Sequence, residues 1–400
     1  MSVTELLASI KDIGRDEATG GYYRPVFSPA EQELRAWFLA EAAKRDLNTE
    51  VDRNGVIWAW WGTPQPGSIV TGSHLDSVPG GGAYDGPLGV TAALAAVDLM
   101  RAEGFTPNKS LAVVVFPEEE GSRFGIACLG SRLMTGKLSP ETARALTDSE
   151  GNTLADVFAR GGIDPDGIGR DETALSRIGR FIELHIEQGR ELIDLGQPIA
   201  VAKSILGHGR WRVTVRGQGN HAGTTLMRDR RDPLVAAAAM VCEVQARALE
   251  IESARATVGR FEPVPGGTNV IASDVSFWID ARHPDDDVTR ALVDRLAATF
   301  PSIAAEQGCT VEVREESWSS RVDFDADVAA DLQAALGGNI PALHTGAGHD
   351  AGILSEFVPT GMLFTRNPTG VSHAPDEGAE DADADYSGVA LAQVLKAALS

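Results

Sequence analysis

The sequence predicts an α/β protein: a three-layer domain built on a largely parallel sheet, with a smaller α+β domain inserted into it. Strand and helix signals alternate through the first third of the chain, and one strand is a continuous apolar run. The pattern changes after Gly207, and α/β character returns from about Val322. A chain of 400 residues is also longer than one typical core, so two domains are expected.

The N-terminal part of the chain shows the alternation clearly. We expect helices over residues 29–45 and 87–102, and strands over residues 56–61, 68–73 and 111–116. Pro87 suits the start of a helix, because its missing N–H would be unpaired there anyway. The run LAVVVF at 111–116 is typical of a strand buried on both faces.

The middle of the chain predicts a compact β-α-β-β-α-β unit of ferredoxin-like type at residues 208–316. Its expected strands and helices cover residues 211–215, 232–249, 275–281, 285–300 and 309–313. The flanking segments, 1–207 and 317–400, would together form the larger domain. The acidic stretch at 376–385 is interpreted as a solvated surface.

Composition and charge exclude several classes of protein. The hydrophobic fraction of 43% and the charged fraction of 23% are those of a soluble globular protein. The net charge of −22 argues against nucleic acid or an anionic membrane surface as a partner. Three cysteines without a CxxC pair, and no apolar run long enough to span a bilayer, predict a cytoplasmic protein.

Imidazole and carboxylate side chains follow the predicted strands, at the ends where an α/β sheet forms its ligand crevice. They are His74, Asp76, Asp85, Glu118, Glu119, Glu120 and His185, joined by His373 in a later loop. Mixed histidine and carboxylate ligands with a spare glutamate beside them suit hydrolysis at a divalent metal. Asp76, two residues after His74 on the same strand face, could fix the orientation of that imidazole.

Each of these residues also has an ordinary interpretation. Asp85 could cap the helix that starts at Pro87, His185 could be a buried core histidine, and His373 could be a loop residue. The three consecutive glutamates could form a solvated loop, although crowded like charges need cations to offset them. Where cations are bound, one carboxylate can hold the metal while its neighbour moves a proton. The joint occurrence of all the groups favours a metal site.

Seven motifs spread from His74 to His373 resemble the M20 metallopeptidase superfamily, and within it the hydantoinase/carbamoylase branch. They are GSHLDSVPGGGAYDGPLGV, EEEGSRF, ELHIEQG, GNHAGTT, GGTNVIAS, GAGHDAG and GVSHAPDE, in this order. That branch contains N-carbamoyl-L-amino-acid hydrolases, β-ureidopropionases and allantoate amidohydrolases. The resemblance implies a di-metal catalytic domain and an inserted domain that serves as lid and dimerisation domain.

The resemblance also implies the roles of individual residues at two divalent ions per subunit. The implied metal ligands are His74, Asp85, Glu120, His185 and His373, with Asp85 bridging the ions. Glu119 would be the general base and acid, and Asp76 the partner of His74. The ions would be zinc, with manganese, cobalt or nickel as alternatives.

For substrate binding, the resemblance implies contacts from Gln188, Asn269, Arg282 and Gly370. His221 would reach the active site of the partner subunit in a homodimer and stabilise the oxyanion there. Arg282 suits a carboxylate because its planar fork can donate two parallel hydrogen bonds, although a surface ion pair at a strand end is its ordinary interpretation.

Together these residues predict a metal-dependent amidohydrolase that cleaves the carbamoyl C–N bond of an N-carbamoyl-L-amino acid or a ureido acid such as allantoate. Its substrate would be small and anionic, and ammonia and carbon dioxide would be released. Two rival hypotheses are an aminoacylase or dipeptidase of the same superfamily, and a catalytically inactive ligand-binding scaffold. The completeness of the candidate ligand set, with Glu119, argues against the scaffold.

Overall fold

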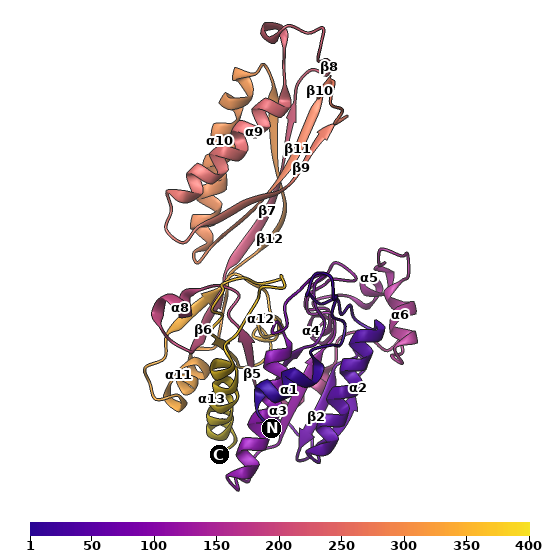
Figure 1. Cartoon of the computed structure of the whole chain (residues 1–400), viewed down its shortest axis with the longest axis vertical. Helices are drawn as coiled ribbons and strands as arrows, with labels where there is room; N and C mark the ends of the chain where they lie inside the picture. The colour runs from indigo at the N-terminus through magenta and orange to yellow at the C-terminus, as the bar shows by residue number, and fades with distance from the viewer. The chain divides into compact units, whose positions relative to one another are not determined.

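The computed structural model describes all 400 residues and divides into two units (Figure 1). The larger unit comprises Met1–Lys203 and Asp323–Ser400, and the smaller one comprises Ser204–Val322. The sequence placed the boundaries at 207/208 and 316/317. They differ because the first and last strands of the four-stranded sheet, in chain order, are longer than predicted: β7 is Gly207–Arg216 and β12 is Thr310–Ser319.

A nine-stranded sheet forms the centre of the larger unit. Its order is β1 (Asn48–Val51), β2 (Ile57–Trp61), β4 (Leu111–Phe116), β3 (Ser68–His74), β5 (Ile178–Ile186), β15 (Thr360–Thr365), β6 (Ile199–Ile205) and β13 (Val322–Asp323), with β14 (Ala342–Thr345) paired to β6. The four central strands, β4, β3, β5 and β15, are parallel. Strands β1, β2 and β6 extend the sheet in antiparallel fashion. The predicted α/β fold with a parallel sheet is thus confirmed at its centre.

Helices cover both faces of this sheet, as the three-layer prediction requires. One face packs into a single apolar core with α1 (Val3–Ile10), α2 (Pro29–Lys44), α3 (Pro87–Ala102), α11 (Ala326–Ala335) and α13 (Asp381–Leu399). Successive side chains of a strand point to opposite faces, so Leu184 joins that core while Glu183 points away from it. On the opposite face Glu183 accepts a hydrogen bond from the backbone N–H of Ala351, in α12 (Asp350–Leu354).

Strand β3 is the point where the strand order of the sheet reverses. Its neighbours are β4 on one side and β5 on the other, and all three strands run in the same direction. Open α/β sheets bind their ligands outside the carboxyl ends of the strands at such a switch point. The fold therefore places His74, the last residue of β3, where a ligand site is expected.

Several helices and strands begin and end where the sequence predicted. Helix α3 and strand β4 have the predicted limits, and α2 ends one residue earlier, at Lys44. Ser28 caps α2 through its hydroxyl, which accepts a hydrogen bond from the N–H of Glu31, and Pro29 occupies the first turn.

The interpretation of residues 376–385 as a solvated surface holds only in part: Asp376, Glu380 and Asp381 are exposed, but two other acids are buried. Helix α13 begins at Asp381, and Asp383 is buried, where its carboxylate lies 2.7 Å from Nε of Arg366. Glu377 is also buried. Composition suggested exposure because acids are usually solvated, but these two carboxylates have specific partners inside the protein.

The smaller unit contains a four-stranded antiparallel sheet in the order β12, β7, β11 (Asp274–His283), β9 (Arg255–Val264). Along the chain its main elements follow the sequence β7-α9-β9-β11-α10-β12. Helices α9 (Pro233–Leu249) and α10 (Asp286–Glu306) cover one face of the sheet and enclose a core that includes Val213, Phe277 and Phe300 (Figure 1). A short pair of strands, β8 (Asn220–His221) and β10 (Val270–Ile271), completes the unit.

Two predictions for this unit need correction. Strand β9 was missed, because it is an edge strand whose side chains are mostly exposed and lack an apolar run. Helix α10 was predicted to end at Phe300, since Pro301 removes a helical N–H, yet it continues to Glu306. Phe300 and Ala304 are both buried in the core, and this packing holds the helix on either side of the proline. None of the helices in the chain has both the length and the apolar character needed to cross a membrane.

The close contact of α3 with β5 gives a test of the packing. A Cβ atom at Gly89 would lie 2.2 Å from the carbonyl oxygen of Leu184. Alanine gains up to about 1 kcal/mol in helix propensity, but overpacking costs about 1–3 kcal/mol and requires the helix to move. We expect Gly89→Ala to lower the free energy of unfolding in urea. Gly259→Ala, where the new Cβ meets nothing within 4 Å, should be nearly neutral. Equal stability of both variants would contradict the packing.

Candidate metal centre

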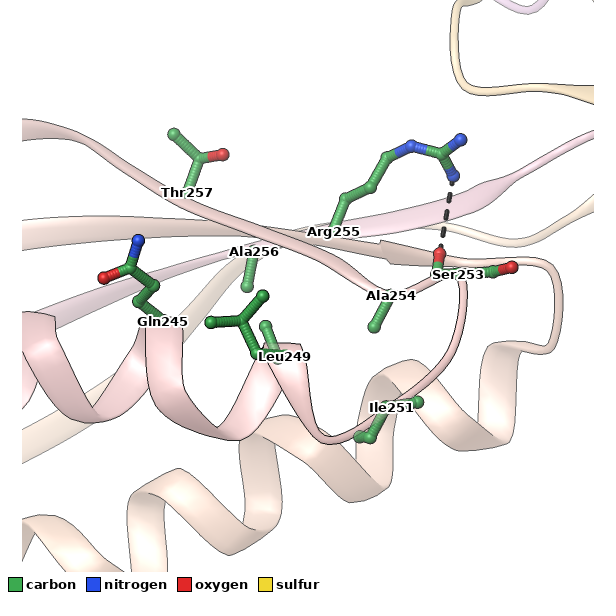
Figure 2. A pocket seen from close by; sticks show the side chains of 9 residues that line it. Gln245, Leu249, Ile251, Ser253, Ala254, Arg255, Ala256 and Thr257 are labelled. Atoms are coloured by element: carbon green, nitrogen blue, oxygen red, sulfur yellow. Dashed lines mark hydrogen bonds between the residues drawn. The ribbon is translucent and has the colours of Figure 1, made fainter. Parts of the chain in front are cut away.

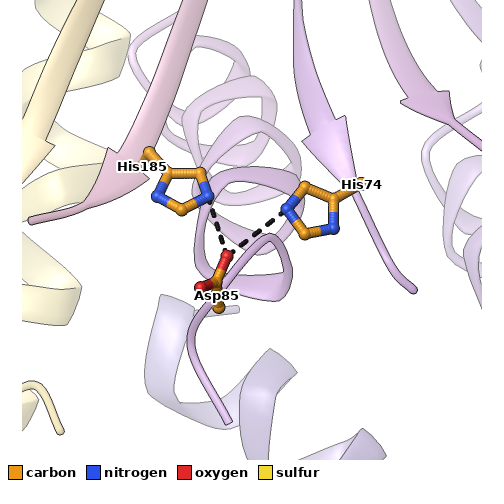
Figure 3. A group of neighbouring side chains, drawn as sticks. All are labelled: His74, Asp85 and His185. Carbon is orange, nitrogen blue, oxygen red and sulfur yellow. Dashed lines mark ion pairs between the residues drawn. The ribbon is translucent and has the colours of Figure 1, made fainter. Parts of the chain in front are cut away.

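The first group of candidate ligands is held by the central strands of the sheet. His74 ends β3, His185 lies near the end of β5, and Asp85 lies in the loop before α3 (Figure 3). Oδ1 of Asp85 is 3.1 Å from Nε2 of His185 and 3.5 Å from Nε2 of His74. These three ligand atoms lie within 4.8 Å of one another, which is a suitable arrangement for one metal ion.

The backbone sets which ring nitrogen of each of these histidines faces Asp85. Nδ1 of His185 donates a hydrogen bond to the carbonyl of Ile186 at 2.9 Å. Nδ1 of His74 donates to the carbonyl of Asp76 at 3.1 Å. A carbonyl can only accept, so both Nδ1 atoms carry the proton and both Nε2 atoms have a lone pair for a metal.

The second group of candidate ligands uses the other oxygen of Asp85. Nε2 of His373 lies 3.4 Å from Oδ2 of Asp85 and 3.3 Å from Oε2 of Glu120. These atoms also lie within 4.8 Å of one another. Asp85 thus belongs to both groups, with one oxygen toward each. The interpretation of Asp85 as a helix cap does not hold, because the residue at the N-cap of α3 is Gly86 and no side chain caps that helix.

The residues present fit metal ions, as their unpaired buried atoms show. Nε2 of His74, Nε2 of His185 and Oε1 of Glu120 are buried and have no hydrogen-bond partner. Such atoms usually cost free energy, since buried polar groups are nearly always paired. Imidazole nitrogens and carboxylate oxygens are also the donor atoms that zinc and related divalent ions prefer.

The electrostatics of the group indicate that bound cations would stabilise its ionised carboxylates. Burial raises the pKa of Glu120 to about 8, and the carboxylate of Asp85 acts in the same direction. The pKa of Asp85 lies well below its usual range, because His185 and His74 outweigh the effect of its burial. The pKa of His74 lies well above its usual value, because Glu119 and two aspartates outweigh burial. Divalent ions would stabilise the ionised carboxylates that these side chains crowd together.

Glu119 lies beside the first group but is not one of its candidate ligands. Its Oε2 is 3.7 Å from Nε2 of His74, and its Oε1 is 3.5 Å from Sγ of Cys128. Burial raises the pKa of Cys128 well above its usual value, so the thiol keeps its proton and can donate to Glu119. Burial also raises the pKa of Glu119 well above its usual range. A carboxyl with a raised pKa suits proton transfer near neutral pH, as predicted for this residue.

Two further carboxylates hold the glutamate turn through backbone hydrogen bonds. Oδ1 and Oδ2 of Asp76 accept from the N–H groups of Glu119 and Glu120, each at 3.1 Å. Oε1 of Glu118 accepts from the N–H groups of Arg123 and Phe124 at 2.8 and 2.7 Å. Glu118 and Glu119 are buried, so the interpretation of this turn as a solvated loop is wrong. Asp76 therefore orients the two glutamates in addition to its contact with His74.

Gln188 also lies at this centre, and Gly370 lies in the loop that leads to His373. Nε2 of Gln188 donates to Oδ2 of Asp85 at 2.8 Å and is 3.3 Å from Nε2 of His373. The N–H of Gly370 donates to Oδ1 of Asn367 at 3.1 Å, which fixes the loop that precedes His373.

The other three predicted site residues belong to the smaller unit. His221 lies in β8 and pairs with Val270, and the N–H of Ala222 donates to the carbonyl of Asn269 at 3.0 Å. His221 and Asn269 are therefore close to each other. Arg282, at the end of β11, donates through Nε and Nη2 to the carboxylate of Asp280, at 2.7 and 3.0 Å.

The structure brings three further polar residues to the centre: Ser372 and Glu377, whose roles the sequence did not indicate, and His349, from the motif GAGHDAG, which was not predicted to be a ligand. His349 is buried against His185, with ring centroids 4.5 Å apart, and belongs to neither ligand group. Ser372 lies 3.3 Å from Oδ2 of Asp85, and Glu377 accepts from the N–H of Asp85 at 3.0 Å. No local pattern identifies Glu377, because the N–H groups that it binds come from a distant part of the chain.

The smaller unit contains a pocket of about 420 Å³ between the end of α9 and the start of β9 (Figure 2). Its lining includes Leu249, Ile251 and Ala256, and its one charged residue, Arg255, donates to the carbonyl of Ser253 at 3.5 Å. It holds none of the predicted site residues, so chemistry is assigned to the metal centre instead.

This fold and this arrangement of ligands define a metal-dependent hydrolase. Residues 70–397 match the model of peptidase family M20/M25/M40, and the chain belongs to that family. It is 34% identical over 376 residues to an N-carbamoyl-L-amino acid amidohydrolase of Geobacillus stearothermophilus, covering 93% of this chain and 91% of that one. It is 34% identical over 382 residues to an allantoate amidohydrolase of Escherichia coli, covering 94% and 92%.

Solved structures show the same relationship. A hydantoinase/carbamoylase family amidase from Burkholderia multivorans superimposes with a TM-score of 0.89 at 28% identity, covering 99% of this chain and 97% of that one. The predicted resemblance to the hydantoinase/carbamoylase branch is confirmed, and with it the predicted class of hydrolase acting on carbon–nitrogen bonds. Family membership and the two ligand groups together support dependence on divalent metal.

The pKa shifts give a test of the metal centre that does not need a substrate. Metals bind deprotonated ligands, whereas the pKa values of His74 and His185 are raised and that of Glu120 is about 8. Metal binding at pH 7 should therefore release protons, and affinity should fall as the pH is lowered from about 8. Calorimetric titration of metal-free protein with Mn²⁺, in two buffers of different ionisation enthalpy, measures that release. Heats that do not depend on the buffer would contradict the assignment.

Proposed function

We propose that the protein is a homodimeric, cytoplasmic amidohydrolase with two divalent ions per subunit. It cleaves the carbamoyl C–N bond of an N-carbamoyl-L-amino acid or of a ureido acid such as allantoate. The observation that carries the proposal is the shared carboxylate of Asp85, with one oxygen toward each ligand group and Glu119 beside the first. The names of the relatives support the substrate class, and the three free cysteines fit a reducing compartment.

In this proposal His74, His185 and Asp85 hold one ion, and Asp85, Glu120 and His373 hold the other. Zinc suits these ligands, and manganese, cobalt or nickel are alternatives. When bound, the two ions would polarise the carbamoyl oxygen and lower the pKa of water toward ~7.

Glu119 moves the proton in this reaction. Its carboxylate takes a proton from the water that attacks the ureido carbon, and a new C–O bond forms. When the C–N bond breaks, Glu119 transfers the proton to the departing nitrogen, which leaves as ammonia. The remaining carbamate loses carbon dioxide and gives the amino acid. Cys128 and the turn held by Asp76 keep Glu119 in place for both transfers.

Substrate recognition comes from both units in the proposal. Gln188 and Gly370 contact the substrate beside His373, and Asn269 and Arg282 bind its carboxylate. Asp280 holds the guanidinium of Arg282 in a fixed plane, which suits a bidentate contact. The smaller unit serves as lid and dimerisation domain, and His221 of the partner subunit stabilises the oxyanion.

The role of Glu119 is tested by Glu119→Gln, which keeps the shape of the side chain and removes its basicity. Ammonia release from N-carbamoyl-L-amino acids and allantoate should fall by about 10²- to 10⁴-fold or more, with metal content unchanged. Glu33→Gln, an exposed glutamate of α2, is the matched control. Retained turnover in Glu119→Gln would disprove the assignment. Release of a free carboxylate from acyl or peptidyl substrates, without ammonia from carbamoyl ones, would favour an aminoacylase or dipeptidase.

Exchange of His221 between subunits is tested by complementation. Subunits carrying Glu119→Gln and subunits carrying His221→Ala are each inactive in the proposal. A heterodimer of the two has one site with native Glu119 from one subunit and native His221 from the other. Co-expression with two affinity tags isolates this heterodimer, and ammonia release should return at that one site. A heterodimer as inactive as both parents would show that His221 does not act across the interface.

A further inference from the structure

Glu377 joins the two loops that carry the ligands of the second ion. Its side chain is buried, 5% exposed, and its own N–H closes a turn onto the carbonyl of Ala374 at 3.1 Å. That turn directly follows His373. The carboxylate points away from the turn toward the loop of Asp85, more than 290 residues earlier in the chain.

The contacts of the Glu377 carboxylate are specific on both sides. Oε1 accepts hydrogen bonds from the backbone N–H groups of Tyr84 and Asp85, both at 3.0 Å. Oε2 lies 3.3 Å from Oγ of Ser372, and that hydroxyl is also 3.3 Å from Oδ2 of Asp85. One carboxylate thus holds both the backbone of Asp85 and the side chain of Ser372, the residue before His373.

The loop of Asp85 leaves space for this carboxylate at Gly82. A Cβ atom at position 82 would lie 2.3 Å from Oε1 of Glu377 and 2.5 Å from its Cδ. The backbone of Gly82 does not adopt a left-handed conformation, so another residue could take its place if Glu377 were absent. The absence of a side chain at this position is therefore explained by the contact with Glu377.

The second ligand group needs such a support more than the first. His74 and His185 lie in strands, and each is fixed by a hydrogen bond from Nδ1 to a carbonyl. His373 lies in a loop, its side chain is 49% exposed, and its backbone has φ +57°, in the left-handed region. A non-glycine residue keeps that conformation only where its surroundings enforce it.

We propose that Glu377 is a positioning residue for the second ion: it clamps the loop of Asp85 to the loop of His373 and sets the distance between these two ligands. The inference rests on the two-ion centre proposed above. Loss of the clamp should weaken the ion held by Asp85, Glu120 and His373. The ion held by His74, His185 and Asp85 should be retained, because the strands fix both imidazoles.

The test measures metal binding rather than turnover. Metal-free protein and its variants are titrated with Co²⁺ or Mn²⁺, and bound metal is counted after equilibrium dialysis. Wild type should bind two ions. Glu377→Ala should keep the first and lose about 10- to 100-fold in affinity for the second, the usual effect of removing a residue that supports a ligand. Glu377→Gln should recover most of that affinity, because its amide oxygen still accepts from both N–H groups.

Two further variants keep the test conclusive. Gly82→Ala should reproduce the loss seen in Glu377→Ala by displacing the carboxylate, and it carries the test if Glu377→Ala fails to fold. Asp376→Asn removes a charge from the same turn at an exposed position and should bind both ions like wild type. Unchanged second-ion affinity in Glu377→Ala, or equal loss of both ions, would overturn the clamp alone. A wild type that binds fewer than two ions would contradict the proposed two-ion centre as well.

Discussion

The contact on which the candidate metal centre depends is the sharing of one buried carboxylate between two groups of candidate ligands. Asp85 directs Oδ1 toward two imidazoles on neighbouring strands and Oδ2 toward a third imidazole on a distant loop. This sharing requires the carboxylate to sit at the end of β3, where the strand order reverses and three strand ends converge. Three parts of the fold bring these side chains together. The parallel strands β3 and β5 carry His74 and His185, the glycine-rich loop before α3 carries Asp85, and the loop after β15 carries His373.

The buried acids around the centre fall into two groups with different roles. Asp76, Glu118, Glu183 and Glu377 accept backbone N–H groups and thereby fix the conformations of loops. Asp85, Glu119 and Glu120 face imidazoles. Backbone hydrogen bonds lower the pKa of such a carboxylate, although burial still raises the pKa of Glu118 to about 8 and that of Glu377 to about 7. Divalent ions would stabilise the ionised forms of Glu119 and Glu120 in the second group, so different carboxylates would serve loop conformation and metal binding.

The sequence was sufficient to predict the sheet centre and to select the candidate ligands that the structure brings together, because both depend on short patterns. Apolar runs located β3 and β4, and acids or imidazoles at the strand ends identified His74 and the glutamate turn. Glu377 could not be predicted in this way, since its partners are backbone N–H groups brought together from the other end of the chain. The acidic residues around Glu377 and Asp383 suggested that both side chains are solvated, whereas both are buried. Edge strand β9 and the continuation of α10 past Pro301 were not predicted for a related reason: tertiary packing overrides local propensity.

The two ligand groups differ in both rigidity and chemistry, and both differences favour metal binding at the first group. The first combines two strand-borne imidazoles with one carboxylate oxygen, a set that suits zinc. The second combines one loop-borne imidazole with two carboxylates, a harder set that also suits manganese. A rigid, imidazole-rich site binds its metal with little rearrangement, whereas the second site depends on contacts that hold two loops together. The first site should therefore fill at lower metal concentration. Because Asp85 contributes to both sites, an ion in the first would fix the carboxylate that the second requires, so the loops would need to order only around His373 and Glu120.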